Sequence, residues 1–107
     1  MRLNPKEVNA IVQAFADCLS PITYKLYLFG SRADDNKKGG DIDLLVVVAN
    51  EFKSDVAQKK TTIRSRIFDS IDEQKIDITV ATEDETLKDP FLSTIFPTAI
   101  LMPSGNE

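Results

Sequence analysis

The feature that most constrains the fold is an unbroken apolar run at residues 44–48, LLVVV. Successive side chains of a β-strand point to opposite faces of the sheet, so a strand that is apolar at every position is covered on both faces. The run therefore predicts a central strand with other elements packed above and below it. A small layered domain of helices and strands satisfies that requirement.

Three further segments are expected to be strands, from their composition or from alternating apolar and polar residues. Residues 24–29 are aromatic and aliphatic and stop at Gly30, and KIDITVA at residues 75–81 alternates apolar and polar side chains. A short edge strand precedes Pro103. The expected strands are residues 24–29, 41–48, 75–81 and 99–102, with a polar loop over residues 31–40.

Apolar residues at helical spacing predict the helices. Asn4 is a good capping residue, Pro5 fits the first turn and Glu7 completes a capping box, so the first helix begins there. A second helix begins at Ser54 or Asp55. The expected helices are residues 5–18, residues 54 or 55 to 71, and residues 91–96, with a turn or short helix at residues 83–87.

Taken in order, these elements predict one α+β domain over residues 1–107, built on a small mixed sheet packed with helices. Residues 104–107 are expected to form a flexible tail. The apolar residues Phe91 and Ile95 are expected to pack in the core, with a role at an interface as the alternative.

The composition excludes several classes of function. The chain has one cysteine and no histidine, which excludes a disulfide within the chain, Cys/His zinc sites and triads with an imidazole base. Its net charge of -4 argues against a broad basic surface that grips nucleic acid. The basic residues Lys59, Lys60, Arg64 and Arg66 are expected to form a solvated helix face, with phosphate contact as the alternative.

Neither a secretory signal nor a membrane span is expected from the sequence. The first residues, MRLNPKEV, contain no apolar core, and no apolar run reaches the length that crosses a bilayer. We therefore expect a cytoplasmic protein that does not insert into a membrane.

Two aspartates open the central strand. Asp41 and Asp43 are two positions apart, so in a strand their side chains share one face, with Cα atoms about 6.6 Å apart. Carboxylates this close repel each other unless a cation neutralises them. Oxygen ligands without histidine or cysteine favour a hard cation such as Mg²⁺. The alternative is that both are strand-entry residues that face water.

Small residues flank the aspartate pair. Gly30 ends the preceding strand where the chain must turn sharply, and Ser31 offers a backbone N–H and a hydroxyl to a phosphate oxygen. Gly39 and Gly40 have no side chains, so a ligand can approach the backbone closely. Anion donors beside metal-binding carboxylates describe a site for a nucleoside triphosphate bound with its metal.

Asp77 is the candidate third carboxylate. If its strand lies beside the central strand, Asp77 sits next to Asp43 and helps to hold a metal near an incoming hydroxyl. The alternative, of equal weight, is an exposed aspartate on a strand face.

These residues resemble a known family. Gly30-Ser31, then Asp41-Ile42-Asp43, then an aspartate in a later strand are similar to the nucleotidyltransferase superfamily that includes the DNA polymerase β palm and kanamycin nucleotidyltransferase. Within it, the string GSRA…GGDIDLLV most resembles the bacterial minimal nucleotidyltransferases. One departure is that Asp34 and Asp35 stand where arginine and glycine are frequent in these proteins.

The resemblance implies a transfer of a nucleoside monophosphate, AMP from ATP in most members, with release of pyrophosphate. It implies that Asp41 and Asp43 bind the catalytic Mg²⁺. Asp77 would complete the metal site and assist deprotonation of the acceptor hydroxyl.

The resemblance also implies the nucleotide contacts. Gly30, Ser31 and Gly40 would hold the triphosphate, and Arg32 would steady the departing pyrophosphate. The alternative for Arg32 is a surface ion pair with an acidic neighbour in the same loop.

Family members of this length resemble the nucleotidyltransferase half of two-chain toxin–antitoxin modules. Their partner is a helical HEPN-domain ribonuclease toxin, which the antitoxin can AMPylate. The resemblance therefore implies a HEPN-type partner, with RNA as the other acceptor and with homo- or hetero-oligomers as assemblies. The alternative is a catalytically idle antitoxin or assembly subunit that acts by covering its partner.

Other acidic and phosphate-binding motifs fit less well. A calcium loop that starts at Asp34 would need an acidic or amide residue at position 38 and glutamate at position 45, where the chain has Lys38 and Leu45. A Walker P-loop is absent, because no Gly-Lys-Ser/Thr follows the turn. A glycosyltransferase Asp-x-Asp site belongs to much longer domains.

Overall fold

The computed structural model describes residues 3–30 and 40–103. Its strands are β1 (Tyr24–Phe29), β2 (Ile42–Val48), β3 (Ile76–Ala81) and β4 (Ile100–Met102). Its helices are α1 (Pro5–Leu19), α2 (Lys53–Ala57), α3 (Lys60–Phe68), α4 (Glu83–Lys88) and α5 (Pro90–Ile95), with the 3₁₀ turns η2 (Asn50–Phe52) and η3 (Phe96–Thr98). The predicted tail at residues 104–107 lies outside the described residues.

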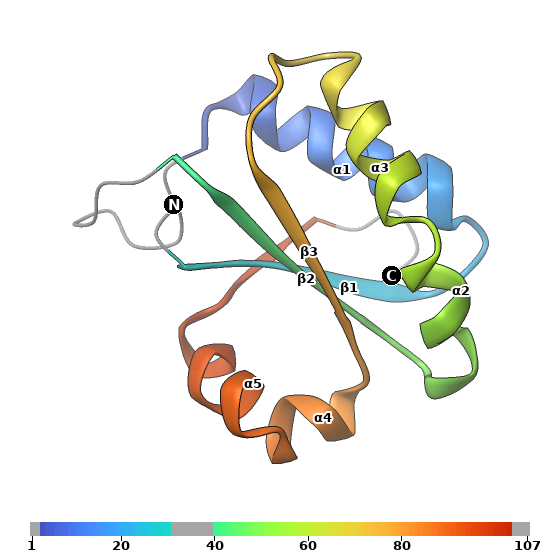
Figure 1. Cartoon of the computed structure of the whole chain (residues 1–107), viewed down its shortest axis with the longest axis vertical. Helices are drawn as coiled ribbons and strands as arrows, with labels where there is room; N and C mark the ends of the chain where they lie inside the picture. Colours follow the sequence, from blue (N-terminus) through green and yellow to red (C-terminus); the bar gives the residue numbers. More distant parts are fainter. Residues whose placement is uncertain (1–2, 31–39, 104–107) are drawn as a thin grey trace.

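The strands form one mixed sheet in the order β3-β2-β1-β4. β1 is antiparallel to both β2 and β4, whereas β2 and β3 run parallel (Figure 1). β2 therefore lies inside the sheet, and Leu44 to Val48 are all buried. The predicted central strand and the α+β class with a small mixed sheet are confirmed.

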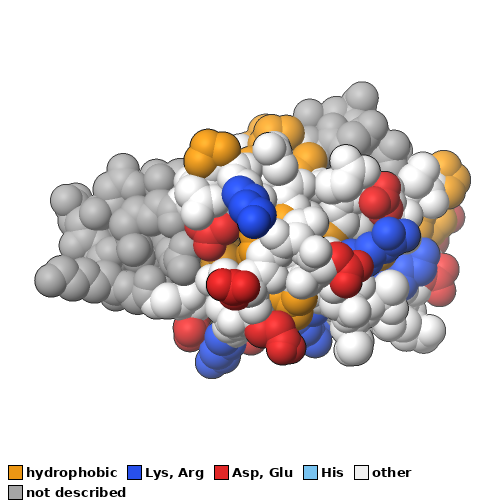
Figure 2. Space-filling view, turned by 90° about the horizontal axis from the view of Figure 1, so that it is seen from above, with side chains coloured by type: hydrophobic (Ala, Val, Ile, Leu, Met, Phe, Trp, Pro, Cys, Tyr) orange, Lys and Arg blue, Asp and Glu red, His pale blue; other side chains and the backbone are white. Residues whose placement is uncertain are grey.

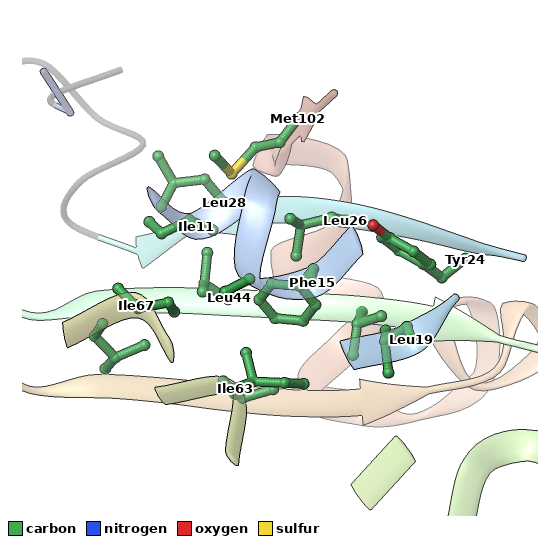
Figure 3. Packing of buried hydrophobic residues seen from close by; sticks show 14 of the residues in the cluster. Ile11, Phe15, Leu19, Tyr24, Leu26, Leu28, Leu44, Ile63, Ile67 and Met102 are labelled. Carbon is green, nitrogen blue, oxygen red and sulfur yellow. The ribbon is translucent and has the colours of Figure 1, made fainter. Parts of the chain in front are cut away.

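The larger part of the core lies between the sheet and the layer formed by α1 and α3. Figure 3 shows Phe15 of α1 and Ile63 of α3 packed in one cluster with Leu44 of β2. α1 begins at the expected capping box, in which the Asn4 side chain accepts from the Glu7 N–H and the Glu7 carboxylate accepts from the Asn4 N–H. The buried stripe of α1 then faces the strands.

A smaller cluster covers the opposite face of the sheet. Leu45 and Val47 of β2 meet Leu92 of α5 there, and Ile95 and Phe96 pack around them. In Figure 1, α4 and α5 lie below the sheet, on the side away from α1 and α3. Successive apolar side chains of β2 thus point into two separate cores, one on each face of the sheet.

The prediction of one helix from residue 54 or 55 to residue 71 is wrong, because the segment forms two helices. Lys59 lies between them, and its N–H donates to the Val56 carbonyl at 3.0 Å, three residues back, which tightens the chain. The Lys59 ammonium group donates to the Cys18 carbonyl at the end of α1, at 3.1 Å. α2 packs on β3 and α3 packs on α1, so one straight helix would not reach both neighbours.

The basic residues of this segment make contacts within the chain. Arg64 donates to the Ile76 carbonyl at 3.4 Å, and Arg66 lies 3.9 Å from an Asp17 oxygen. Figure 2 shows acidic and basic side chains interspersed on the side of the molecule where α1 and α3 lie. These observations favour the expected solvated face over a phosphate-binding patch.

The core assignment of Phe91 is wrong, whereas Ile95 packs against the smaller cluster as expected. α5 is short and buries Leu92, so the preceding residue points away from the centre of the cluster. Phe91 keeps 58% of its surface exposed. Across residues 3–30 and 40–103, no helix combines the length and the apolar character that a membrane crossing needs.

Candidate functional site

Strand pairing brings two of the three candidate aspartates together. In the parallel pair of β2 and β3, Asp43 is in register with Asp77. Partners in register point to the same face of a sheet, so the two carboxyl groups are neighbours. The condition set for Asp77, a strand beside the central strand, is therefore met. Both side chains lie on the face covered by α4 and α5, because Leu45 follows Asp43 at the next inward position on that face.

The acidic neighbours of Asp43 change its titration. Burial raises the pKa of Asp43, and the nearby carboxylates of Asp77 and Asp41 raise it further, as does a hydrogen bond between the Asp43 and Asp77 carboxyl groups. The Lys75 ammonium group acts in the opposite direction and lowers that pKa. The cluster therefore favours an added positive charge, whether a proton or a metal cation.

The turn after β1 is shaped around the same carboxylate. Gly30 has a φ of +75°, a conformation that other residues rarely adopt. A Cβ atom at this position would lie 3.2 Å from the Asp43 Cγ and would collide with a carboxylate oxygen. Glycine is thus required at position 30 for two reasons, the positive φ and the lack of space for a Cβ atom. The Gly30 backbone lies directly against Asp43. At Gly40, by contrast, an added Cβ would meet no heavy atom of the described residues within 4 Å.

Lys75 is a site residue that the sequence reasoning missed. Its Nζ lies 3.6 Å from an Asp41 oxygen and 4.0 Å from an Asp77 oxygen, and its side chain is 66% exposed. An exposed ion pair of this length contributes about 0–1 kcal/mol, so a more strongly bound cation can displace it. The signal was present in the sequence, because Lys75 precedes Asp77 by two positions and shares its strand face.

Asp41 lies one residue before β2, which begins at Ile42. The Ile42 N–H donates to the Lys75 carbonyl at 3.0 Å, and this bond ties the entry of β2 to the entry of β3. Asp41 therefore belongs to the cluster through its electrostatic effect on Asp43 and its ion pair with Lys75. Asp43 and Asp77, by contrast, are in direct register.

The donor set suits Mg²⁺ better than a metal that needs a complete protein cage. Over the described ranges, no three His, Cys, Asp or Glu residues form a group that could hold a metal ion by themselves. Mg²⁺ commonly binds through one or two carboxylates together with water and substrate phosphates. Asp43 and Asp77 supply such a pair of oxygen donors. The metal-binding roles of Asp41, Asp43 and Asp77 stay predictions.

The predicted nucleotide contacts lie at and between Gly30 and Gly40. Ser31, Arg32 and Gly39 lie outside the described residues. Gly30 and Gly40 are described at the two ends of that segment. Their roles with the triphosphate also stay predictions.

Neighbouring carboxylates on parallel strands, beside a turn that only glycine fits, are typical of a metal-assisted phosphoryl-transfer site. The comparison with known families names the class more closely: the family model described as "Nucleotidyltransferase domain" matches residues 8–96. The chain belongs to this family, and the family supports nucleotidyl transfer as its general activity. The matched range includes Gly30, Asp41, Asp43 and Asp77. No curated protein matches the chain.

Proposed function

We propose that this protein transfers AMP from ATP to a hydroxyl acceptor in a Mg²⁺-dependent reaction. The observation that carries the proposal is the register of Asp43 with Asp77 against the Gly30 turn. The raised pKa of Asp43 supports it, because a carboxylate held among like charges gains most from a bound cation. Family membership supports the reaction class.

The transfer is a single displacement at phosphorus. The acceptor oxygen forms a bond to the α-phosphorus, and the bond from that phosphorus to the pyrophosphate oxygen breaks. The acceptor proton passes to the Asp77 carboxylate, and pyrophosphate leaves with the electron pair. Mg²⁺ supplies the positive charge that phosphate oxygens and the leaving group require. No protein nucleophile takes part, which is consistent with a chain that lacks histidine.

The acceptor that we propose is a helical HEPN-type ribonuclease toxin, with this chain as its antitoxin. The resemblance of the GSRA…GGDIDLLV string to minimal nucleotidyltransferases supports this partner. In this role the chain would AMPylate the toxin and block its ribonuclease activity. RNA is the competing acceptor, and the same assay distinguishes the two.

The experiment incubates the purified chain with Mg²⁺, the candidate partner or RNA, and ATP labelled at the α-phosphate. We expect label on the partner, no label when ATP carries the label at the γ-phosphate, and loss of labelling in Asp43→Asn. Asp55→Asn, at an exposed position on α2, is the matched control and should label fully. Full labelling by folded Asp43→Asn would contradict the metal role.

The idle-antitoxin alternative makes a different prediction in cells. If the chain only covers its partner, the double variant Asp41→Asn, Asp43→Asn should protect cells from the toxin as well as the wild type does. If AMPylation neutralises the toxin, that double variant should fail to protect while it still binds the partner.

A further inference from the structure

Phe91 is an exposed aromatic residue whose ring packs against that of Phe29. It keeps 58% of its surface exposed, and its ring meets the Phe29 ring edge to face, with centroids 6.3 Å apart and planes at 74°. The Asp89 carboxylate accepts from the Phe91 N–H at 3.1 Å and from the Leu92 N–H at 3.0 Å, which holds the backbone at the start of α5. An exposed ring that packs against a buried ring, on a backbone held by a cap, is suited to bind a flat ligand with little further ordering.

The partner ring connects Phe91 to the acidic cluster. Phe29 is the last residue of β1, it is directly opposite Asp43 in the antiparallel register, and Gly30 follows it. Residues opposite each other in such a pair have Cα atoms about 4.5–5.5 Å apart and point to the same face. In Figure 1, α5 lies on this face of the sheet, below β1. Phe91 thus contacts the residue directly opposite Asp43, and the Phe29 side chain alone separates it from that position.

We propose that Phe91 is the platform on which the nucleobase of the bound nucleoside triphosphate stacks. This assignment rests on the proposed function, which places the triphosphate at Asp43 and Gly30. A triphosphate held there leaves its base to extend from the acidic cluster, and the Phe91 ring offers an apolar flat surface one side chain away. Stacking of a base on an aromatic side chain is favourable for every base, because each has a π-face.

Stacking also sets the expected base preference. It does not read the hydrogen-bonding edges of a base, so adenine and guanine nucleotides should bind with similar affinity. The larger purine rings overlap more with phenylalanine than pyrimidine rings do, so ATP and GTP should bind more tightly than CTP and UTP.

The other exposed large hydrophobic residues of the described chain lack this connection. Leu87 on α4 is 73% exposed and Leu101 on β4 is 51% exposed, and neither offers an aromatic ring. Contact of Phe91 with a protein partner is the rival explanation for its exposure, and the experiment below separates the two.

The experiment measures binding of Mg²⁺-ATP and of Mg²⁺ with inorganic triphosphate, by calorimetry, to the wild type and to Phe91→Ala. We expect Phe91→Ala to weaken ATP binding about 5- to 150-fold and to leave triphosphate binding unchanged. Phe91→Tyr should bind ATP as the wild type does. Leu87→Ala, the matched control at an exposed apolar position, should also bind ATP normally.

Each outcome bears on a different statement. If Phe91→Ala binds ATP as tightly as the wild type, the stacking assignment is overturned while the proposed function stands. If the wild type binds neither ATP nor triphosphate, the proposed function fails and the assignment fails with it. If Phe91→Ala does not fold, Phe91→Leu keeps apolar cover over Phe29 without a flat ring, and its ATP-specific loss decides the question.

Discussion

At the scale of single residues, the acidic cluster works against the stability of the apo domain. Asp43 has an acidic neighbour at the entry of its own strand and another in register on β3, and partial burial weakens its hydration. A carboxylate kept in such surroundings is typical of a functional site. Lys75 offsets part of the repulsion across the same cluster.

The first prediction concerns Gly30. Gly30→Ala forces an L side chain into a positive φ, which costs about 1–2 kcal/mol, and its methyl group collides with the Asp43 carboxylate. We expect a lower midpoint in urea denaturation and a loss of nucleotidyl transfer. Gly40→Ala is the matched control for stability, because an added methyl group meets none of the described atoms within 4 Å there. Equal stability of the two variants would contradict the close approach at Gly30.

The second prediction concerns the pH dependence that Asp43 introduces. Because the folded-state pKa is raised above the ordinary value of 3.8, folding favours the protonated form. The contribution of Asp43 to stability is therefore fully present below that value, and it is lost as pH rises through the folded-state pKa. In metal-free buffer, Asp43→Asn should be more stable than the wild type at neutral pH, and the difference should shrink as pH falls through the folded-state pKa and level off below 3.8.

Urea denaturation at several pH values, with chelator present, measures this difference. Asp55→Asn at an exposed position controls for the removal of one charge. A stability difference between Asp43→Asn and the wild type that does not change with pH would show that the acidic cluster does not strain the domain.

At the scale of elements, α5 depends on Asp89, the residue that caps its start, for order. The helix spans only Pro90–Ile95, and isolated helices of this length are unstable in water. Two donors at its start are satisfied by the Asp89 carboxylate, and Leu92 anchors it on the sheet. α5 is therefore ordered by its cap and by tertiary packing rather than by its own helical propensity.

The third prediction tests that cap. Asp89→Ala should destabilise the domain by about 1 kcal/mol, because the Phe91 and Leu92 N–H groups lose their acceptor. Hydrogen exchange should accelerate in α5 while α1 stays protected. Asp89→Asn keeps an acceptor oxygen and should retain most of the protection. Unchanged exchange in α5 of Asp89→Ala would mean that packing alone orders the helix.

At the scale of the whole molecule, one strand joins two cores of different size. Leu44 and Leu45 are both fully buried, and they face opposite sides of the sheet. The larger core holds α1 and α3, whereas α5 rests on the smaller one. The face that carries Asp43 is therefore the less heavily packed face.

The fourth prediction separates the two cores. Leu44→Ala and Leu45→Ala should each destabilise the domain by about 2–5 kcal/mol, because each leaves a cavity at a fully buried position. Native-state hydrogen exchange should differ between them, with α1 and α3 loosened in the first variant and α4 and α5 in the second. The same exchange pattern in both variants would contradict two separable cores.

Local patterns determined a large part of this structure. The capping box at Asn4, the apolar run of β2 and the glycine that ends β1 each act over a few residues, so the sequence alone predicts them. Two aspartates two positions apart are unusual at the start of an apolar strand, so the sequence alone also identified Asp41 and Asp43 as candidate site residues.

Tertiary structure decided what depends on the pairing of distant segments. Asp77 reaches Asp43 only because β3 lies parallel to β2 in that register, and Lys75 joins the cluster for the same reason. The helix breaks at Lys59, whose side chain binds the end of α1. Phe91 is exposed because Leu92, not Phe91, packs on the sheet. Hydrophobic periodicity specifies which face of an element is buried, but long-range packing selects its neighbour, and that choice assembles the site.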